Sequence, residues 1–262
     1  MTGAVSLPMY DWPEIRKETD RLWQAIHRQL TERGIAAPAS LDRRMDLEAL
    51  WTDPDLILSQ TCGYPYAHRL ANTATLVATP AHELTGAAPG HYYSVLVARR
   101  NRQPKNLAEL EHKRFAYNMA HSQSGFAAPV RLLAATGHVS SPPPLQTGSH
   151  RASIQAVARS EADWAAIDAV TWQLALRHEP AAGDLAVIAR TPETPALPLI
   201  TGSNHAGQSD IIADAVDAAI QGLDEEVRKA VLVTGSKRFK PADYAPFAVP
   251  VPIGKALPRM TG

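Results

Sequence analysis

The sequence predicts an α/β protein with largely parallel sheets. Predicted strands alternate with predicted helices through most of the chain, the pattern of strands that are joined by helical crossovers. Hydrophobic residues make up 45% of the 262 residues, which is enough to fill a sizeable core. A chain of this length forms one large domain or two smaller ones.

The N-terminal third begins with a helix and continues with strands. Apolar residues recur at helical spacing over residues 14–33, and Gly34 follows as a stop signal. The segment 92–100 is rich in β-branched and aromatic residues and is the clearest strand of the chain. The strands predicted before it are 55–60 and 73–79.

Helices and strands alternate in the middle of the chain. A helix over 106–114 begins at Asn106, a residue type that caps helices. Further helices are predicted at 125–135, 150–161 and 169–178. The strands and extended segments predicted here are 115–120, 142–149, 162–168, 185–191 and 197–203. The tail differs, because two consecutive helices are predicted, at 208–223 and 224–235.

Composition disfavours several classes of function. The 26 Lys and Arg residues balance the 26 Asp and Glu residues, so we expect no nucleic-acid partner. No stretch reaches the roughly 18–20 apolar residues of a membrane span. Cys62 is the only cysteine and has no internal disulfide partner. The ten histidines lack paired metal-ligand spacing, and no cofactor motif is found, so neither a metal nor a cofactor is expected.

The first residues, "MTGAVSLPMYDWPEIRKE", do not resemble a secretory signal. They contain no basic segment followed by a long apolar segment. On this basis the protein is expected in the cytoplasm. A natural chain that begins further upstream would instead place it in the periplasm.

Four polar corners follow predicted strands or extended segments, at 60–65, 121–125, 147–150 and 167–172. Each offers uncharged hydrogen-bond donors, and lysine and arginine are nearly absent from them. Ligands of doubly wound sheets bind beyond the carboxyl ends of the strands. The four corners therefore predict one binding region.

The corner 121–125 contains Ser122, Gln123, Ser124 and Gly125 at the start of a predicted helix. The first turn of a helix has unpaired N–H groups and a partial positive charge. Two hydroxyls and a glycine, which lets a ligand approach the backbone, would add to a site for a small oxyanion. Helix capping explains the serines equally well at this stage.

The other corners offer His150 and Asp168. A neutral imidazole can donate to an oxyanion, although His150 is also readily explained as a capping or surface residue. Asp168 ends an apolar strand and can accept a hydrogen bond from a ligand, or it can cap the helix that follows. Trp172 and Tyr64 can wall a pocket or belong to the core.

A catalytic role finds less support. Cys62 lies at a corner, and His150 is a candidate base for it. The local sequence matches no cysteine-enzyme signature, and no serine-hydrolase, P-loop or zinc-protease motif is present. A single cysteine is more often a small buried residue.

Seven stretches in order resemble the phosphate/phosphonate-type substrate-binding proteins of ABC transporters, which are type 2 periplasmic binding proteins. The resemblance covers about residues 8 to 250. The stretches are "MYDWPE", "DLILSQTCGYP", "YYSVLVAR", "NMAHSQSG", "TGSHRASIQAVA", "ADWAAIDAVTW" and "LPLITG".

The resemblance implies two α/β lobes with the ligand in the cleft between them. Lobe one would contain residues 1–95 and 197–262, and lobe two would be inserted as residues 96–196. The crossings would lie at 92–100 and around 190–202. The C-terminal helices would pack on lobe one.

The resemblance also implies roles for individual residues. The hydroxyls of Ser122 and Ser124 and the amide of Gly125 would hold phosphoryl oxygens, with His150 and Asp168 at the next corners. Aromatic residues of lobe one would be Tyr10, Tyr64 and Tyr93.

The implied function is capture of a small oxyanion such as phosphate, phosphite or a phosphonate for ABC uptake. A transporter permease would be the partner, and no catalysis is expected. A carboxylate repels an anion unless a ligand oxygen carries a proton, so Asp168 favours a mono-protonated ligand. No acidic lobe-one residue can be assigned to a ligand ammonium, which disfavours aminoalkyl-phosphonates.

Two alternatives remain at this stage. The missing signal favours a cytoplasmic sensor or carrier on the same fold. An enzyme acting on a small phosphorylated or pyrimidine-like metabolite, through Cys62 or His150, is the other.

Overall fold

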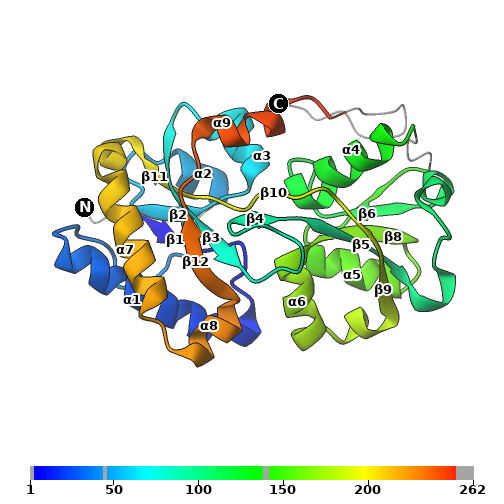
Figure 1. The fold of residues 1–262 in the computed structure, drawn as a ribbon, viewed down its shortest axis with the longest axis horizontal. Coiled ribbons are helices and arrows are strands. Elements are labelled where there is room, and N and C mark those ends of the chain that lie inside the picture. Colours follow the sequence, from blue (N-terminus) through cyan, green and yellow to red (C-terminus); the bar gives the residue numbers. More distant parts are fainter. Residues whose placement is uncertain (1–2, 44–45, 138–141, 252–262) are drawn as a thin grey trace. The chain divides into compact units, whose positions relative to one another are not determined.

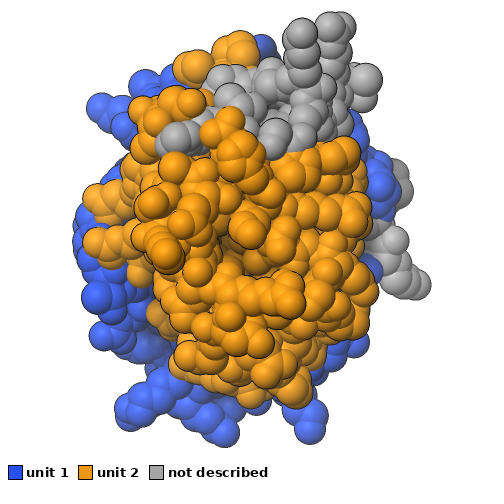
Figure 2. All heavy atoms as spheres, turned by 90° about the vertical axis from the view of Figure 1, so that its right-hand side faces the viewer, with its two compact units in different colours: residues 1–91, 195–248 blue, residues 92–194, 249–262 orange. Residues whose placement is uncertain are grey.

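The computed structural model describes residues 3–43, 46–137 and 142–251. Their contacts divide the chain into two units (Figures 1 and 2). Unit 1 comprises Met1–His91 and Pro195–Ala248, and unit 2 comprises Tyr92–Thr194 and Val249–Gly262. Val249 groups with unit 2, where its carbonyl accepts a hydrogen bond from Arg131. Two short strands, β4 (His91–Tyr92) and β10 (Thr194–Pro195), pair with each other at the points where the chain changes unit.

Unit 1 contains a five-stranded mixed sheet. Only β1 and β2 are parallel, and the other neighbours are antiparallel. In spatial order the strands are β1 (Val5–Ser6), β2 (Leu58–Gln60), β11 (Leu199–Gly202), β3 (Ala74–His82) and β12 (Val233–Lys237).

Helices α1 (Arg16–Glu32), α7 (Ser209–Gln221) and α8 (Glu225–Val231) pack together beside this sheet. The predicted apolar face of α1 supplies the buried Trp23, Ile26 and Leu30 to the core of unit 1. Burial of each such side chain contributes about 1.5–3 kcal/mol, so this face fixes the helix against the sheet.

Smaller helices and turns complete unit 1, and several of them supply a second apolar cluster, which contains Tyr66, Tyr244 and Phe247. The helices are α2 (Leu47–Thr52), α3 (Gly63–Pro65) and α9 (Pro241–Tyr244). The 3₁₀ turns are η1 (Pro13–Ile15), η7 (Ser203–Gln208) and η8 (Ala245–Ala248), and η2 (Tyr66–Leu70) is a π-helical turn.

The predicted helix 224–235 is wrong at its C-terminal end. Helix α8 stops at Val231, because Leu232 adopts the left-handed conformation with φ 59°. The β-branched Val233 and Thr234 then begin β12, which pairs with β3.

Unit 2 contains the second five-stranded sheet. Its neighbours β7, β6 and β8 are parallel, whereas β5 is antiparallel to both β8 and β9. In spatial order the strands are β7 (Leu145–Gln146), β6 (Phe115–Tyr117), β8 (Trp164–Asp168), β5 (Ser94–Arg99) and β9 (Leu185–Arg190). Both sheets are therefore mixed, and the prediction of largely parallel sheets is wrong. The antiparallel neighbours are β11 with β2 and β3, β12 with β3, and β5 with β8 and β9.

Each parallel strand of unit 2 leads into a helix. In Figure 1, α4 (Ala128–Ala135) lies on one side of the strands, and α5 (His150–Ala158) and α6 (Ala169–His178) lie on the other. The predicted helix 106–114 is a 3₁₀ helix, η4 (Leu107–His112), capped by Asn106 as expected. The remaining turns are η3 (Arg100–Arg102), η5 (Gln123–Ala127) and η6 (Pro180–Asp184).

The predicted helix 125–135 begins as a wider π-helical turn, η5. Ala127 N–H donates to the carbonyl of Ser122, and Ala128 N–H donates to that of Gln123, five residues back in each case. Pro129 has no N–H to continue this ladder. The Ser124 carbonyl is thereby left for a partner outside the helix.

None of the helices in the described part of the chain combines the length and apolar character that a bilayer crossing needs.

Candidate functional site

Three helix starts meet the same edge of the unit 2 sheet. Strands β6, β7 and β8 are parallel neighbours, so their carboxyl ends lie together, and η5, α5 and α6 begin there. Ser122, Ser149 and Asp168 are the residues that cap these starts. Aligned peptide dipoles leave partial positive charge at helix N-termini, so this edge favours an anion.

Ser122 acts as a helix cap. Its hydroxyl accepts a hydrogen bond of 3.0 Å from Gly125 N–H, and only 6% of the residue is exposed. The Gly125 amide, which the resemblance assigns to the ligand, is thus paired within the chain. A Cβ on Gly125 would collide with the Asn118 side chain and touch the His150 ring, so their packing requires glycine.

Ser124 and His150 form the central pair of the site. The Ser124 hydroxyl lies 2.9 Å from His150 Nε2, although 26 residues separate them in sequence. Burial lowers the pKa of His150 to about 4, and the nearby backbone of Ala166 offsets part of that effect. The imidazole is therefore neutral near pH 7. When Nε2–H donates to Ser124, the serine hydroxyl hydrogen is available for an anion.

Ser94 supports this pair from the neighbouring strand. Strand β5 begins at the edge where β8 ends, and Ser94 is opposite Asp168 in the ladder. The Ser94 hydroxyl donates a 2.8 Å hydrogen bond to the Ser124 carbonyl that Pro129 leaves free. Ser94 is not among the predicted site residues, because no local signal marks it.

Asp168 caps α6. One carboxylate oxygen accepts hydrogen bonds from the N–H groups of Val170 and Thr171, at 2.8 and 2.9 Å. The residue is only 1% exposed. The capping alternative is therefore correct, and a further contact of Asp168 with a ligand oxygen stays a prediction.

Gln123 and Trp172 are buried beside these helix starts. The side-chain oxygen of Gln123 accepts a hydrogen bond from Arg131 on α4, at 3.3 Å. Arg131 is a cation that the corner sequences did not reveal, because it lies two turns into the helix.

Tyr93 belongs to unit 2, whereas the resemblance places it in lobe one. Its carbonyl accepts a hydrogen bond from Ala169 N–H at the start of α6. The Arg190 guanidinium lies 5.4 Å from the centre of its ring, a cation–π distance. Arg190 is a second cation that the corner sequences did not reveal.

Tyr10 and Tyr64 belong to unit 1 and each contact a histidine. The Tyr10 ring meets His82 edge to face, with ring centres 5.4 Å apart. The Tyr64 ring stacks on His68 at 3.9 Å. The structure thus brings the serine, glycine, histidine and aspartate predictions together in unit 2, and these two tyrosines lie in the other unit.

Within the described ranges, no group of three His, Cys, Asp or Glu side chains is arranged to hold a metal ion.

A family described as "ABC transporter, phosphonate, periplasmic substrate-binding protein" matches residues 52–247. The chain belongs to this family. The predicted family and the predicted two-lobed type 2 fold are confirmed. The family is one of substrate-binding proteins and not of enzymes, so the catalytic alternative through Cys62 or His150 is not supported. No curated protein matches the chain.

Solved structures share the fold over almost the whole length of the binding protein. The methylphosphonate complex of PhnD1 from Prochlorococcus marinus has 17% identity and a TM-score of 0.70, over 93% of this chain and 94% of that chain. The protein XAC2383 from Xanthomonas citri, bound to ATP, has 15% identity and a TM-score of 0.69, over 95% and 96%. The binding protein component of an ABC phosphonate transporter from Pseudomonas aeruginosa has 17% identity and a TM-score of 0.65, over 94% and 83%.

Proposed function

We propose that the binding protein captures a small, singly protonated oxyanion, such as phosphate, phosphite or an alkylphosphonate, for uptake by an ABC transporter. The observation that carries this proposal is the Ser124–His150 pair at the edge where three helices begin. Ser122, Gln123, Gly125 and Asp168 surround the pair. Tyr10, Tyr64, Tyr93 and Trp172 are the proposed aromatic contacts.

Neutral groups supply the proposed recognition. Ser122, Ser149 and Asp168 already satisfy amides of the first helical turns, so the helices act mainly through their dipoles. Of the two serine hydroxyls in the corner 121–125, that of Ser122 caps a helix and that of Ser124 does not. In the tautomer that carries its hydrogen on Nε2, a neutral His150 donates to Ser124 without adding charge, so shape and protonation state decide which anion binds.

Asp168 supports selection for a protonated ligand. Its carboxylate lies at the same strand edge, and a second negative charge nearby is unfavourable. A ligand that carries one acidic hydrogen can donate it to a carboxylate oxygen, whereas sulfate has none to donate near pH 7. This is specificity by repulsion of the wrong ligand.

The proposed partner is a transporter permease, and the proposed compartment is the periplasm. The family is one of periplasmic substrate-binding proteins that work with ABC transporters. The methylphosphonate complex of the Prochlorococcus protein supports a ligand of this size.

A sensor function is the second candidate. A histidine kinase sensor domain with similarity to periplasmic binding proteins shares the fold, with 16% identity and a TM-score of 0.59. A permease gene beside the gene of this protein would favour transport, and a kinase gene would favour sensing. The cytoplasmic sensor or carrier that the sequence leaves open belongs to this second candidate.

A thermal-shift panel on the full chain tests the ligand class. A ligand at about 100 times its dissociation constant stabilises the folded state by roughly 2.7 kcal/mol, an upward shift of about 5–10 °C in unfolding midpoint. The panel contains phosphate, phosphite, methylphosphonate, sulfate and ATP, with sodium chloride at matched ionic strength as control. A shift with ATP alone, or with none of the anions, would contradict the proposal.

A further inference from the structure

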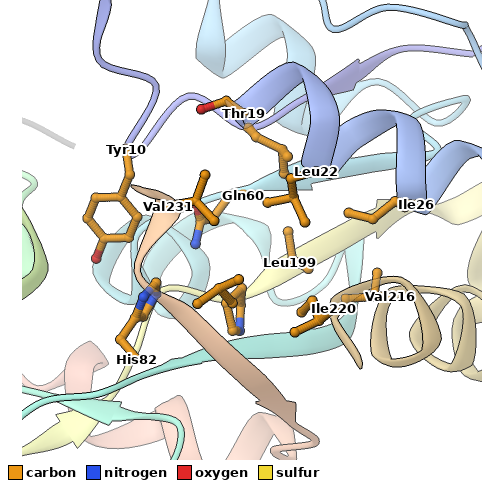
Figure 3. A pocket seen from close by; sticks show the side chains of 13 residues that line it. Tyr10, Thr19, Leu22, Ile26, Gln60, His82, Leu199, Val216, Ile220 and Val231 are labelled. Carbon is orange, nitrogen blue, oxygen red and sulfur yellow. The ribbon is translucent and has the colours of Figure 1, made fainter. Parts of the chain in front are cut away.

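Unit 1 contains a cavity between its sheet and helices α1 and α7 (Figure 3). Its volume is about 50 Å³. The buried side chains of Ile26, Leu199, Val216 and Ile220 form its apolar interior. In Figure 3 they lie at the end away from Tyr10 and His82. The cavity is therefore an apolar space with a polar end.

His82 defines the polar end. Its Nδ1 lies 2.7 Å from the carbonyl oxygen of Leu232, and a carbonyl can only accept, so Nδ1 carries the hydrogen. Burial lowers the pKa of His82 to about 4, so the ring is neutral near pH 7. Nε2 is then a hydrogen-bond acceptor, and no described residue donates to it.

The lining excludes a charged occupant. Among the described residues that line the cavity, none is Asp, Glu, Lys or Arg. A buried ion without a partner loses its hydration at a large cost. At roughly 10–15 Å³ for each water-sized group, the space holds about three to five such groups, and an apolar lining offers water few partners.

We propose that this cavity binds a small uncharged molecule that has an aliphatic body of a few carbons and one hydroxyl or amide group. The hydroxyl or amide donates a hydrogen bond to His82 Nε2, and the carbons fill the space beside Val216. The residues that line this cavity belong to unit 1, whereas the serine, histidine and aspartate residues of the anion site belong to unit 2. Tyr10 lines this cavity and is also one of the proposed aromatic contacts of the anion.

Butan-1-ol and its isomer diethyl ether, each with five non-hydrogen atoms, are suitable probes, and saturation-transfer NMR on the full chain measures their binding. Val216→Phe fills the interior and should weaken both probes at least about tenfold. Ile211→Phe makes a similar change on the exposed side of the same helix and should leave both unchanged. Val216→Leu adds a single methylene and should weaken binding by a smaller factor.

His82→Phe separates the hydrogen bond from the apolar contacts. It should weaken butan-1-ol about three- to tenfold and leave diethyl ether nearly unchanged, because only the alcohol donates to Nε2. Phosphate binding should persist in the two Val216 variants, because Val216 is not among the residues proposed for the anion, so the two sites are tested separately.

Two results would overturn the proposal. One is no binding of either probe up to about 10 mM, where a ligand with a millimolar dissociation constant is near saturation. The other is equal affinity in the wild type, Val216→Phe and Val216→Leu.

Discussion

The hydroxyl of Ser94 donates a hydrogen bond of 2.8 Å to the carbonyl of Ser124. This bond ties the first residue of β5 to the turn that presents Ser124 to His150. Both serines are buried, so neither partner is readily replaced by water. Ser94 is therefore a positioning residue for the proposed anion site.

Ser94→Ala should destabilise the protein by about 1–3 kcal/mol, because a buried carbonyl loses its partner. It should also weaken anion binding, since the turn that presents Ser124 is no longer held to β5. Urea unfolding and calorimetry with phosphate measure the two effects. Ser203→Ala, at an exposed position of unit 1, is the matched control and should change neither. Unchanged stability in Ser94→Ala would show that the carbonyl finds another donor.

Ser124→Ala should weaken every anion that binds, whatever its protonation state. The change removes a donor to an ionised oxygen, which costs about 1.5–3 kcal/mol, or roughly ten- to hundredfold in affinity. Titration calorimetry with phosphate and methylphosphonate measures the loss. Ser122→Ala should instead act mainly on stability, because that hydroxyl caps a helix. Full affinity in Ser124→Ala would place the anion elsewhere.

Asp168→Asn should narrow the selectivity between phosphate and sulfate. Asparagine also caps helices, so the structure should be kept. The variant loses the charge that repels fully ionised anions, and sulfate should gain relative to phosphate. Calorimetry between about pH 5 and pH 8 follows the ratio, because phosphate changes its protonation across this range. Equal effects on both ligands would show that Asp168 is a cap only.

His82 should make folding stability depend on pH. Its pKa is about 4 in the folded chain and about 6.5 when unfolded. The unfolded chain thus binds the proton first, and stability present above about pH 6.5 is lost as the pH falls toward 4. The loss is at most about 3 kcal/mol. Urea unfolding measures the free energy of unfolding of the wild type and of His82→Phe, and the two values should converge as the pH falls. A difference that stays constant with pH would contradict the lowered pKa of His82.

Local patterns predicted most helices, because the relevant residues are neighbours in sequence. The periodic face of α1, the Asn106 cap and the β5 segment each carry their own signal. Strand β12 was missed, because Val231 to Val233 continue an apolar spacing that fits a helix. The left-handed conformation of Leu232 ends the helix, and pairing with β3 makes the next residues a strand.

The predicted site residues lie just after predicted strands, and such polar corners can be recognised in the sequence alone. Sequence could not show that Ser122 and Asp168 use their oxygens as caps, since capping and ligand binding require the same residue types. The Ser94–Ser124 bond depends on the register of β5 against β8, in which Ser94 is opposite Asp168. Register is a tertiary property, so this partner was not predictable.

Strand β11 lies between β2 and β3 in the sheet of unit 1, although it follows both by more than a hundred residues. Ribosomal synthesis therefore delivers β2 and β3 long before the strand that joins them. All five strands of the unit 2 sheet, by contrast, have been made once Arg190 is added. The inserted unit can thus complete its sheet first, and the unit that begins the chain is also the last to close.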